Sequence, residues 1–495
     1  MEWARRHKVL VCGIAAALVA ARVVGVSLFP GVGVDEGFWI SGPRNFLLYG
    51  NALLDGRLHS FLSPAHFAFL TAFLSIAHPS LLAARLFSAA AGVMTCAALG
   101  VIAFRAFPKR PWLYLLLYGL GTSILIDRVA WLEAHQIFWL ALAACLWLSK
   151  WRFGPFAAAA AYGVALLVKS NSAFLLPAFL LASPGTLIAD GFVITEGFRV
   201  VGGSRRNTVF VFLAIVGVVA LGGYMVDYMV SPGSFAQAFR FELDGVQWVD
   251  ENVLFHVGRF GFSPQRAFAA ASYLVSRQPI VIALALIGLV QVLRVCREST
   301  PTDRFFAAWL VGGVLFHFGQ IYVEARYMAT LAPATYYLAA RCLDRFWSRY
   351  GQLEGRSWAR ALPLAVVVLS CGLQLARVTV GLIHTPNADY LRTRDWIATH
   401  VPLRARVIAS PSLNVSLGQR SYDFFRLINP YGHTASRPMA RIAAATHPDY
   451  IIVDAEWHAY ESPDMADFVA QECERVARFG QYVVYHVKPP VESLG

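Results

Sequence analysis

The chain has 495 residues, of which 57% are hydrophobic and only 15% are charged. An ordinary soluble domain carries about 25% charged residues, so this composition excludes a typical cytosolic enzyme. The formal net charge of +12 arises from residues 1–383, because residues 384–495 hold 11 basic and 12 acidic residues. The basic residues form short clusters between apolar runs, as in the cytoplasmic loops of membrane proteins, which argues against nucleic-acid binding.

Apolar runs follow one another along the first three quarters of the chain. A helix that crosses a bilayer takes about 20 apolar residues, and somewhat fewer where a site or cavity shortens it. Eleven runs meet this description: 9–29, 81–104, 112–126, 135–148, 155–168, 172–183, 208–229, 279–295, 305–321, 328–341 and 361–383. The first run lacks a clear small-residue cleavage site, so we expect a retained helix there and not a signal peptide. We therefore predict a polytopic α-helical membrane domain over residues 1–383.

Lys and Arg are distributed unevenly between alternate loops, with 19 in one set and 9 in the other. Because cytoplasmic loops are rich in these residues, we expect a cytoplasmic N-terminus and, after eleven crossings, an extracytoplasmic C-terminus. The membrane would be a bacterial inner (plasma) membrane, with the tail in the periplasm. Segment 61–77 is apolar, but a crossing there would reverse the topology, so we expect it to lie at, or dip into, the outer face. The outer loops 30–80 and 230–278 should fold back over the membrane surface.

The pattern changes from about His384, where charged residues become frequent. Short β-branched or aromatic runs at 406–410, 450–454 and 482–487 predict strands, and segments 389–400 and 464–478 carry helical spacing. The sequence therefore predicts a small soluble α/β domain over residues 384–495.

Two adjacent carboxylates, Asp35 and Glu36, come soon after the first apolar run. At the mouth of a membrane cavity, such a pair is suited to supply a proton-accepting base and a contact to a metal ion or an acceptor. The alternative is that Asp35 caps a helix beginning near Phe38, since Asp after a Gly-rich turn suits the free amides of a helix start. The sequence leaves both interpretations open.

A second acidic group, Asp127 and Glu133, falls in a very short outer loop. Asp127 could simply pair with its neighbour Arg128. Glu133 starts the next predicted helix and would point into the bundle or the outer cavity, where an ionisable side chain is costly unless it is paired or used. We therefore favour a functional role for Glu133 over one for Asp127.

Several basic residues are predicted near the outer face. Each could simply extend its charged end toward the lipid headgroups, as Lys and Arg usually do. Together they suggest a site for an anion at headgroup level, such as a lipid phosphate. These residues are Arg22, Arg85 and Arg377 within apolar helices, and Arg128, Lys169 and Arg326 in outer loops.

The histidines of the two long outer loops, His59, His66 and His256, do not have the spacing of zinc ligands, and we expect them at the surface or among headgroups. The sequence contains no P-loop, dinucleotide fingerprint, GxSxG elbow or CxxC motif. Nucleotide-driven transport and soluble nucleotide-sugar transfer therefore lose support.

Six short motifs follow one another in the order seen in membrane glycosyltransferases of the GT-C fold. They are Asp35-Glu36, Ser63-Pro64-Ala65-His66-Phe67, Ala84-Arg85-Leu86-Phe87-Ser88-Ala89, Arg128 with Glu133, Leu167-Val168-Lys169, and Arg326-Tyr327 followed by Pro333. Over roughly residues 9–340 the chain resembles the branch that contains protein O-mannosyltransferases and lipid A aminoarabinose transferases. It departs from that branch at Ser63-Pro64-Ala65, where relatives often show a basic or His residue before two prolines.

The resemblance implies an enzyme that takes a sugar, a hexose or a pentose, from a polyprenyl-phosphate carrier. The acceptor would be a hydroxyl of a glycan, lipid or protein at the outer face, and direct displacement would invert the anomeric centre. Asp35 matches the family's general base, and Glu133 matches its later loop acid. No cofactor is assigned with certainty, and a divalent metal ion is left open.

We accordingly expect Asp35 as the base, supported by Glu36 and Glu133, and a carrier-phosphate site that holds the departing phosphate. The residues expected to contact that phosphate are Arg22, Arg85, Arg128, Lys169, Arg326 and Tyr327. Two other classes remain: a lipid or sugar transporter or flippase, and a non-catalytic membrane assembly subunit. Against a transporter, no Gly/Pro-broken helices recur at matching positions in two halves.

Overall fold

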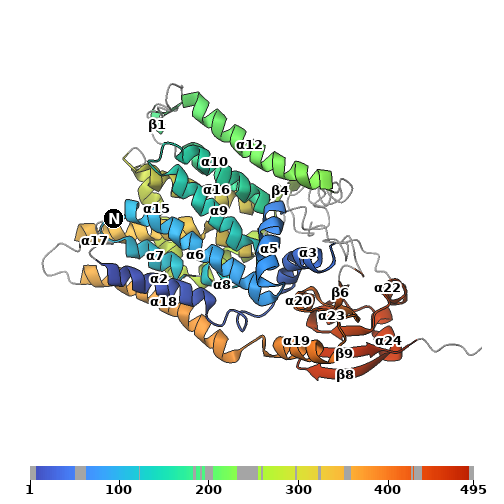
Figure 1. The fold of residues 1–495 in the computed structure, drawn as a ribbon. Coiled ribbons are helices and arrows are strands. Elements are labelled where there is room, and N and C mark those ends of the chain that lie inside the picture. The colour runs from blue at the N-terminus through green and yellow to red at the C-terminus, as the bar shows by residue number, and fades with distance from the viewer. Residues whose placement is uncertain are drawn as a thin grey trace, which may run out of the picture.

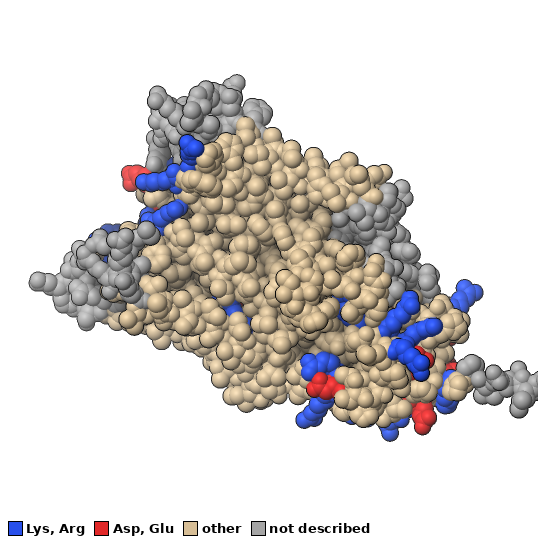
Figure 2. Space-filling view, viewed as in Figure 1, with Lys and Arg blue, Asp and Glu red and all other residues tan. Residues whose placement is uncertain are grey.

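The structure of the protein is a computed structural model in which a helical bundle carries a small mixed sheet at one end (Figure 1). It describes residues 7–50, 63–121, 123–181, 186–189, 192–195, 205–230, 255–257, 260–295, 298–320, 325–350, 358–424, 427 and 438–489. Figure 2 shows charged side chains over the sheet domain and at the opposite edge of the bundle, while the surface between them is almost uncharged. Such an uncharged band is what the hydrocarbon core of a bilayer requires.

The helices of the bundle agree with most of the predicted apolar runs. They are α2 (Lys8–Val23), α6 (Leu81–Ala106), α7 (Pro111–Gly119), α8 (Ser123–Asp127), α9 (Leu132–Trp147), α10 (Gly154–Val168), η1 (Ser170–Leu175), α11 (Leu176–Leu181), α12 (Arg205–Val230), α14 (Pro264–Arg277), α15 (Pro279–Arg294), α16 (Pro301–Phe318), η3 (Ala325–Leu331), α17 (Ala332–Tyr350) and α18 (Trp358–His384). Three runs differ from a single α-helix: 112–126 is broken between α7 and α8, 172–183 begins as the 3-10 helix η1, and 328–341 begins in the 3-10 helix η3. Two short hairpins, β1 (Thr186–Ala189) with β2 (Phe192–Thr195) and β3 (Phe255–Val257) with β4 (Phe260–Phe262), lie in the connections.

Within the described residues, two helices are long and apolar enough to cross a membrane alone, Leu81–Ala106 and Ala361–His384. The bent pair α14 and α15 would make a third span, and six further apolar helices are shorter. The prediction that all eleven runs cross the membrane is therefore not tested. A helix shorter than 18 residues can cross only where neighbouring helices or a cavity compensate for its length.

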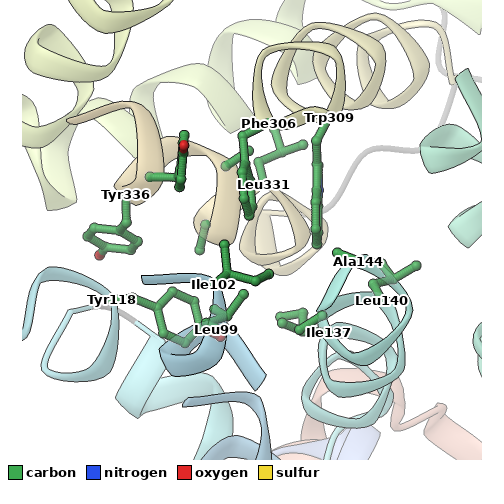
Figure 3. Close-up of a cluster of buried hydrophobic side chains, with 14 of the residues drawn as sticks. Leu99, Ile102, Tyr118, Ile137, Leu140, Ala144, Phe306, Trp309, Leu331 and Tyr336 are labelled. Carbon is green, nitrogen blue, oxygen red and sulfur yellow. The ribbon is translucent and has the colours of Figure 1, made fainter. Parts of the chain in front are cut away.

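The bundle is held together by close helix contacts and aromatic stacks (Figure 3). Phe306 of α16 stacks on Trp309 and on Tyr337 of α17, with ring centroids 5.7 and 4.1 Å apart. Helix α10 contributes buried alanines, and a Cβ at its Gly163 would lie 2.7 Å from Val219 of α12. Small residues at such contacts let helices approach closely, which is how helices associate in lipid.

Two helices of the first outer loop, α3 (Val34–Tyr49) and α5 (Pro64–Ala77), lie between the bundle and the sheet domain (Figure 1). Helix α5 falls within the segment predicted to lie at or dip into the outer face. Buried Ile40 of α3 and Leu70 and Leu74 of α5 share one apolar cluster with residues of the tail. The two helices therefore form the connection between the membrane bundle and the tail.

The tail is a five-stranded sheet in the order β6-β5-β7-β9-β8, flanked by helices. Strands β5 to β7 are parallel, and β7, β9 and β8 are antiparallel neighbours. The elements are α19 (Ala388–His400), β5 (Arg406–Ala409), α20 (Pro411–Asn414), β6 (Arg420–Asp423), α22 (Met439–Thr446), β7 (Tyr450–Val453), α23 (Ala455–Tyr460), α24 (Pro463–Glu472), β8 (Cys473–Phe479) and β9 (Tyr482–Val487).

The three predicted strands of the tail are confirmed as β5, β7 and β9, and the helix at 389–400 is confirmed as α19. The helix predicted over 464–478 is wrong in its second half, because the chain leaves α24 at Glu472 and continues as β8. Pairing with β9 along Cys473–Phe479 outweighs the helical spacing. Strand β6 was not predicted, since Arg420–Asp423 is short and polar.

The tail docks onto the segment that carries the Asp35-Glu36 pair. Asn387 donates hydrogen bonds to the carbonyl oxygens of Ser27 and Pro30, at 2.8 and 2.9 Å, and accepts one from the Val32 amide at 2.9 Å. Further along α3, the Tyr49 hydroxyl donates to the Gln419 carbonyl oxygen at 2.6 Å. The sheet domain therefore holds both ends of α3.

Candidate active site

Helix α3 begins at Val34, with Gly33 as its N-cap residue. The Glu36 carboxylate accepts a hydrogen bond from the Gly33 amide, 3.2 Å away, and so closes the first turn. The predictions of a helix start near Phe38 and of Asp35 as the capping residue are therefore wrong. Asp35 lies inside the first turn instead, with 36% of its side chain exposed, and its carboxylate suits the positive end of the helix dipole.

Glu36 is fully buried and faces Arg85 of α6. The Arg85 Nε and Nη2 atoms donate to the two Glu36 oxygens at 2.8 and 2.7 Å, and the Ala130 amide donates to Glu36 at 2.9 Å. Arg85 also donates to the carbonyl oxygens of Val26 and Pro30, both at 2.8 Å. This pair ties the loop between α2 and α3 to the start of the chain segment that leads into α9.

Two further arginines near the outer end of the bundle are buried and fully engaged with protein groups. Arg22 donates through Nε to Asp127 at 2.8 Å, and both side chains are buried. Arg128 donates hydrogen bonds of 2.9–3.2 Å to the carbonyl oxygens of Ala21, Val24 and Phe29. It thereby pairs carbonyl oxygens that are left without a partner at the C-terminal end of α2. The suggested pairing of Asp127 with Arg128 is therefore wrong, because each neighbour has other partners.

A different set of charges meets where α3, α9 and η3 begin and where α10 ends. The Lys169 ammonium lies 2.6 Å from the Glu133 Oε1 atom, and the Arg326 Nε atom lies 3.6 Å from the same oxygen. Arg326 also forms an ion pair with Asp35 through Nη1. The Tyr327 ring centre lies 3.8 Å from the Lys169 ammonium. These five residues form the candidate active site, which the structure assembles from α3, α9, η3 and the junction of α10 with η1.

Hydrogen bonds of neighbouring residues hold the site in place. Gln136, one turn after Glu133 on α9, donates to Asn171 and Ser172 at 2.6 and 2.9 Å, which fixes the segment that follows Lys169. On η3, the Thr330 hydroxyl donates to the Tyr327 carbonyl at 2.7 Å and lies 3.0 Å from the His317 Nε2 atom. The indole of Trp309 donates to the Thr330 carbonyl at 2.9 Å.

The site balances two carboxylates with two cations and opens toward Asp35. Glu133 is 2% exposed, Arg326 13% and Lys169 16%, whereas Asp35 is 36% exposed. Asp35 is thus the carboxylate of this site that an incoming hydroxyl group can reach. The two cations are close enough together to hold one phosphate, which would compete with the carboxylates for them.

The remaining candidates are less directly connected with this site. His66 is buried, so its predicted surface position is wrong. His59 lies outside the described residues, and the structure does not describe the side chain of His256. Arg377 of α18 contacts Gln374 of its own helix at 3.4 Å.

Sequence reasoning missed two aromatic or imidazole contributors to the surroundings of the site. Trp131, the N-cap residue of α9, lies with its ring 5.6 Å from the Arg326 guanidinium. His135 of α9 is buried against Phe87 of α6. Only the short spacing from Glu133 could have indicated either residue, and proximity in sequence is a weak signal.

The protein thus consists of a helical bundle, two outer helices between the bundle and a small α/β domain, and a charged site to which the first of these helices contributes Asp35. Two solved structures with this fold, both of ArnT from Cupriavidus metallidurans, match 97% of this chain and 98% of theirs at 15% sequence identity. The TM-score is 0.68 for ArnT bound to undecaprenyl phosphate and 0.65 for its apo state. No family model and no curated protein matches the sequence.

The resemblance to GT-C enzymes is thereby confirmed for the fold, and with its apolar helices the chain is an integral membrane protein. At 15% identity the match does not extend to the reaction, which has to be argued from the site itself.

Proposed function

We propose that the protein is an inverting glycosyltransferase that moves a sugar from a polyprenyl-phosphate carrier to a hydroxyl acceptor at the outer face of the membrane. The observation that carries this proposal is that Arg326 links a partly exposed carboxylate, Asp35, to a buried carboxylate, Glu133, which also pairs with Lys169. A transporter or an assembly subunit gives no reason for an exposed base beside a phosphate-sized pair of cations.

Asp35 acts as the general base in this proposal. Its carboxylate takes the proton of the acceptor hydroxyl as that oxygen attacks the anomeric carbon of the donor sugar. The bond from the anomeric carbon to the phosphate oxygen breaks with its electron pair, so the carrier leaves as polyprenyl phosphate. Attack from the side opposite the leaving group inverts the anomeric centre. No nucleotide and no covalent enzyme intermediate is needed.

Lys169 and Arg326 hold the departing phosphate, and Tyr327 keeps Lys169 in place through contact of its ring with the ammonium group. Before the carrier binds, Glu133 and Asp35 together balance the two cations, which avoids uncompensated charge in an apolar region. When the phosphate arrives it takes over part of this role, and the Arg326 contact with Asp35 is weakened. The base is then available to the acceptor.

The fully buried charged residues near the site have structural roles in the proposed mechanism. Glu36 supports the base by fixing the first turn of α3, as its bonds to Gly33, Arg85 and Ala130 indicate. Arg22, Arg85 and Arg128 have no exposed surface and donate to protein oxygens. We therefore assign the carrier phosphate to Lys169, Arg326 and Tyr327 and not to these three arginines.

Among the described residues, no group of three or more His, Cys, Asp or Glu side chains lies close enough together to hold a metal ion. The sugar, a hexose or a pentose, and the glycan, lipid or protein that receives it follow from tests on the purified enzyme. The N-terminus would lie in the cytoplasm and the tail in the periplasm.

The direct test is a transfer assay with purified protein in detergent. Radiolabelled undecaprenyl-phosphate hexose and pentose serve as donors, and an envelope extract of the native cells supplies acceptors. We expect release of undecaprenyl phosphate coupled to labelling of a component of the extract, with the new bond of opposite anomeric configuration to the donor bond. Retained configuration contradicts direct displacement, and absence of release with every donor contradicts the transferase function.

A further inference from the structure

Two histidines lie buried beside the candidate active site, and the proposed reaction does not use them. His66 is in the first turn of α5 and His135 in the first turn of α9, with exposed fractions of 3% and 4%. Both ring nitrogens of His66 and the Nε2 atom of His135 have no hydrogen-bond partner within the described part of the chain. Buried polar groups are normally paired, so these nitrogens point to a ligand.

The two imidazoles face each other inside an aromatic enclosure. Their ring centres are 5.2 Å apart, with an interplanar angle of 66°. Phe87 of α6 stacks on His135 at 4.0 Å, and the Trp39 ring centre lies 6.2 Å from that of His66, with an interplanar angle of 82°. Aromatic walls with a few converging polar atoms are typical of small-ligand sites.

This enclosure adjoins the proposed catalytic residues. Trp39 is four residues after Asp35 on α3, so both lie on the same face of that helix. Glu133 lies within electrostatic reach of the His66 ring. A molecule whose reacting carbon or hydroxyl is next to Asp35 therefore lies near Trp39, which contacts His66.

The charge of the enclosure selects the kind of ligand. Two protonated imidazoles 5.2 Å apart among aromatic rings would be a costly arrangement, so both rings are neutral, and each offers one N–H donor and one lone pair. Neutral imidazoles give an anion no positive charge. Two histidines are fewer than the three protein ligands of a catalytic zinc site, and no group of three or more His, Cys, Asp or Glu side chains that could hold a metal ion occurs among the described residues. Hydroxyl groups, which both donate and accept, match this set.

We propose that His66 and His135 form a subsite that hydrogen-bonds the hydroxyl groups of a sugar ring packed against Trp39 and Phe87. This inference rests on the proposed glycosyltransferase function and specifies the part of the substrate that binds in this region. The sugar belongs either to the carrier-linked donor or to an acceptor glycan, which offer the same hydroxyl chemistry. Both histidines determine specificity, and neither transfers a proton.

The test uses His66→Phe and His135→Phe, in which an aromatic ring without nitrogen replaces the imidazole. Binding of undecaprenyl phosphate is compared with binding of undecaprenyl-phosphate hexose and pentose to each protein. We expect each variant to lose about 3- to 10-fold of the wild-type preference for a glycosylated carrier, the effect of one or two lost hydrogen bonds. Affinity for the unglycosylated carrier should stay unchanged.

Thermal stability separates this role from a structural one. Phe removes the unpartnered nitrogens from an aromatic enclosure, so the Tm of both variants should equal or exceed that of the wild type. His66→Asn, which keeps a donor and an acceptor, should recover part of the preference. His384→Phe, at an exposed histidine that ends α18, is the matched control and should change neither quantity.

The outcomes distinguish the two sources of the sugar and the two proposals. If carrier preference is kept while half-maximal transfer needs about 3- to 10-fold more envelope extract, the subsite holds the acceptor glycan. If carrier preference, acceptor use and carrier binding all stay as in the wild type, the subsite is overturned and the transferase function stands. If the wild-type protein binds no carrier and releases none, the transferase function itself fails, and the subsite fails with it.

Discussion

Asp35 and Glu36 are neighbours in the sequence but have opposite surroundings. Glu36 is enclosed by Arg85 and by two backbone amides, whereas more than a third of Asp35 is exposed at the mouth of the charged site. The difference is set by Arg85, which lies 49 residues further along the chain. A pattern in the sequence can indicate that the pair matters, but only the packing of α6 against α3 indicates which carboxylate is structural.

Replacing Glu36 with Gln should destabilise the protein strongly. The Gln amide group would turn an N–H toward the Arg85 donors and leave a buried charge without its partner, a change that typically costs about 3–5 kcal/mol. We expect a large drop in Tm in a thermal-shift measurement. Glu472→Gln, at an exposed carboxylate that ends α24, is the control. A Tm for Glu36→Gln equal to that of the control would show that the Arg85 pair does not hold the loop.

The cations of the site should affect the donor more than the acceptor. Lys169→Gln and Arg326→Gln each remove one charge that the carrier phosphate would meet, and one charge-assisted hydrogen bond is worth about 1.5–3 kcal/mol. We expect donor KM to rise by about 10- to 100-fold with little change in acceptor KM. Arg392→Gln, at an exposed residue of α19, controls for loss of charge. Unchanged donor KM in both variants would contradict the assignment of the phosphate site.

At the scale of elements, α3 unites the site with the tail. Its first turn carries Asp35, its Gly37 packs against α20, and its last turn bonds to the segment after α20. A helix could be predicted here from sequence, but its start could not, because Gly33 ends the preceding turn without any capping side chain. The same limit applies to β8, where partner strands decide the conformation.

Gly37→Ala tests whether this contact positions the base. A Cβ at Gly37 would lie 2.1 Å from the backbone carbonyl carbon of Pro411, so α3 and α20 would have to separate. We expect a lower Tm together with a fall in kcat, since Asp35 is two residues away. Gly222→Ala on α12, where a Cβ meets nothing within 4 Å, should keep both. Full activity and stability in Gly37→Ala would mean that the tail does not set the position of Asp35.

At the scale of the whole molecule, hydropathy and composition predicted a helical membrane bundle with a small α/β domain. Both predictions were possible because long apolar runs, which indicate membrane helices, and short β-branched or aromatic runs, which indicate strands, can be recognised from neighbouring residues alone. Asp35, Glu133, Lys169, Arg326 and Tyr327 were also identified from sequence, as charges in apolar surroundings or through motif order. Which of these residues pair with one another was not predicted. Arg22, Arg85 and Arg128 look the same as Lys169 and Arg326 in the sequence, and only their complete burial and their bonds to backbone carbonyl oxygens separate the two groups.

Topology can be tested with single cysteines in a background in which all seven native cysteines are replaced by Ser. Leu403→Cys places a thiol on the tail at a position that is 74% exposed, and Trp151→Cys places one at a 54% exposed position between α9 and α10. We expect a membrane-impermeant maleimide to label intact cells only at position 403, and position 151 only after permeabilisation. The reverse pattern would contradict the proposed orientation and place the site on the cytoplasmic face.

The central claim is that Asp35 is the general base, and kcat of Asp35→Asn measures it most directly. Asn keeps the shape of the side chain but cannot accept the proton, and a positioned base contributes about 10²–10⁴-fold. With purified protein and an undecaprenyl-phosphate sugar, we predict a loss of that size in kcat, with a Tm near that of the wild type and carrier affinity at least equal to it. Asp395→Asn, at an exposed carboxylate of α19, should keep full turnover. Near-normal kcat in Asp35→Asn would contradict the account and leave Glu133 as the candidate base.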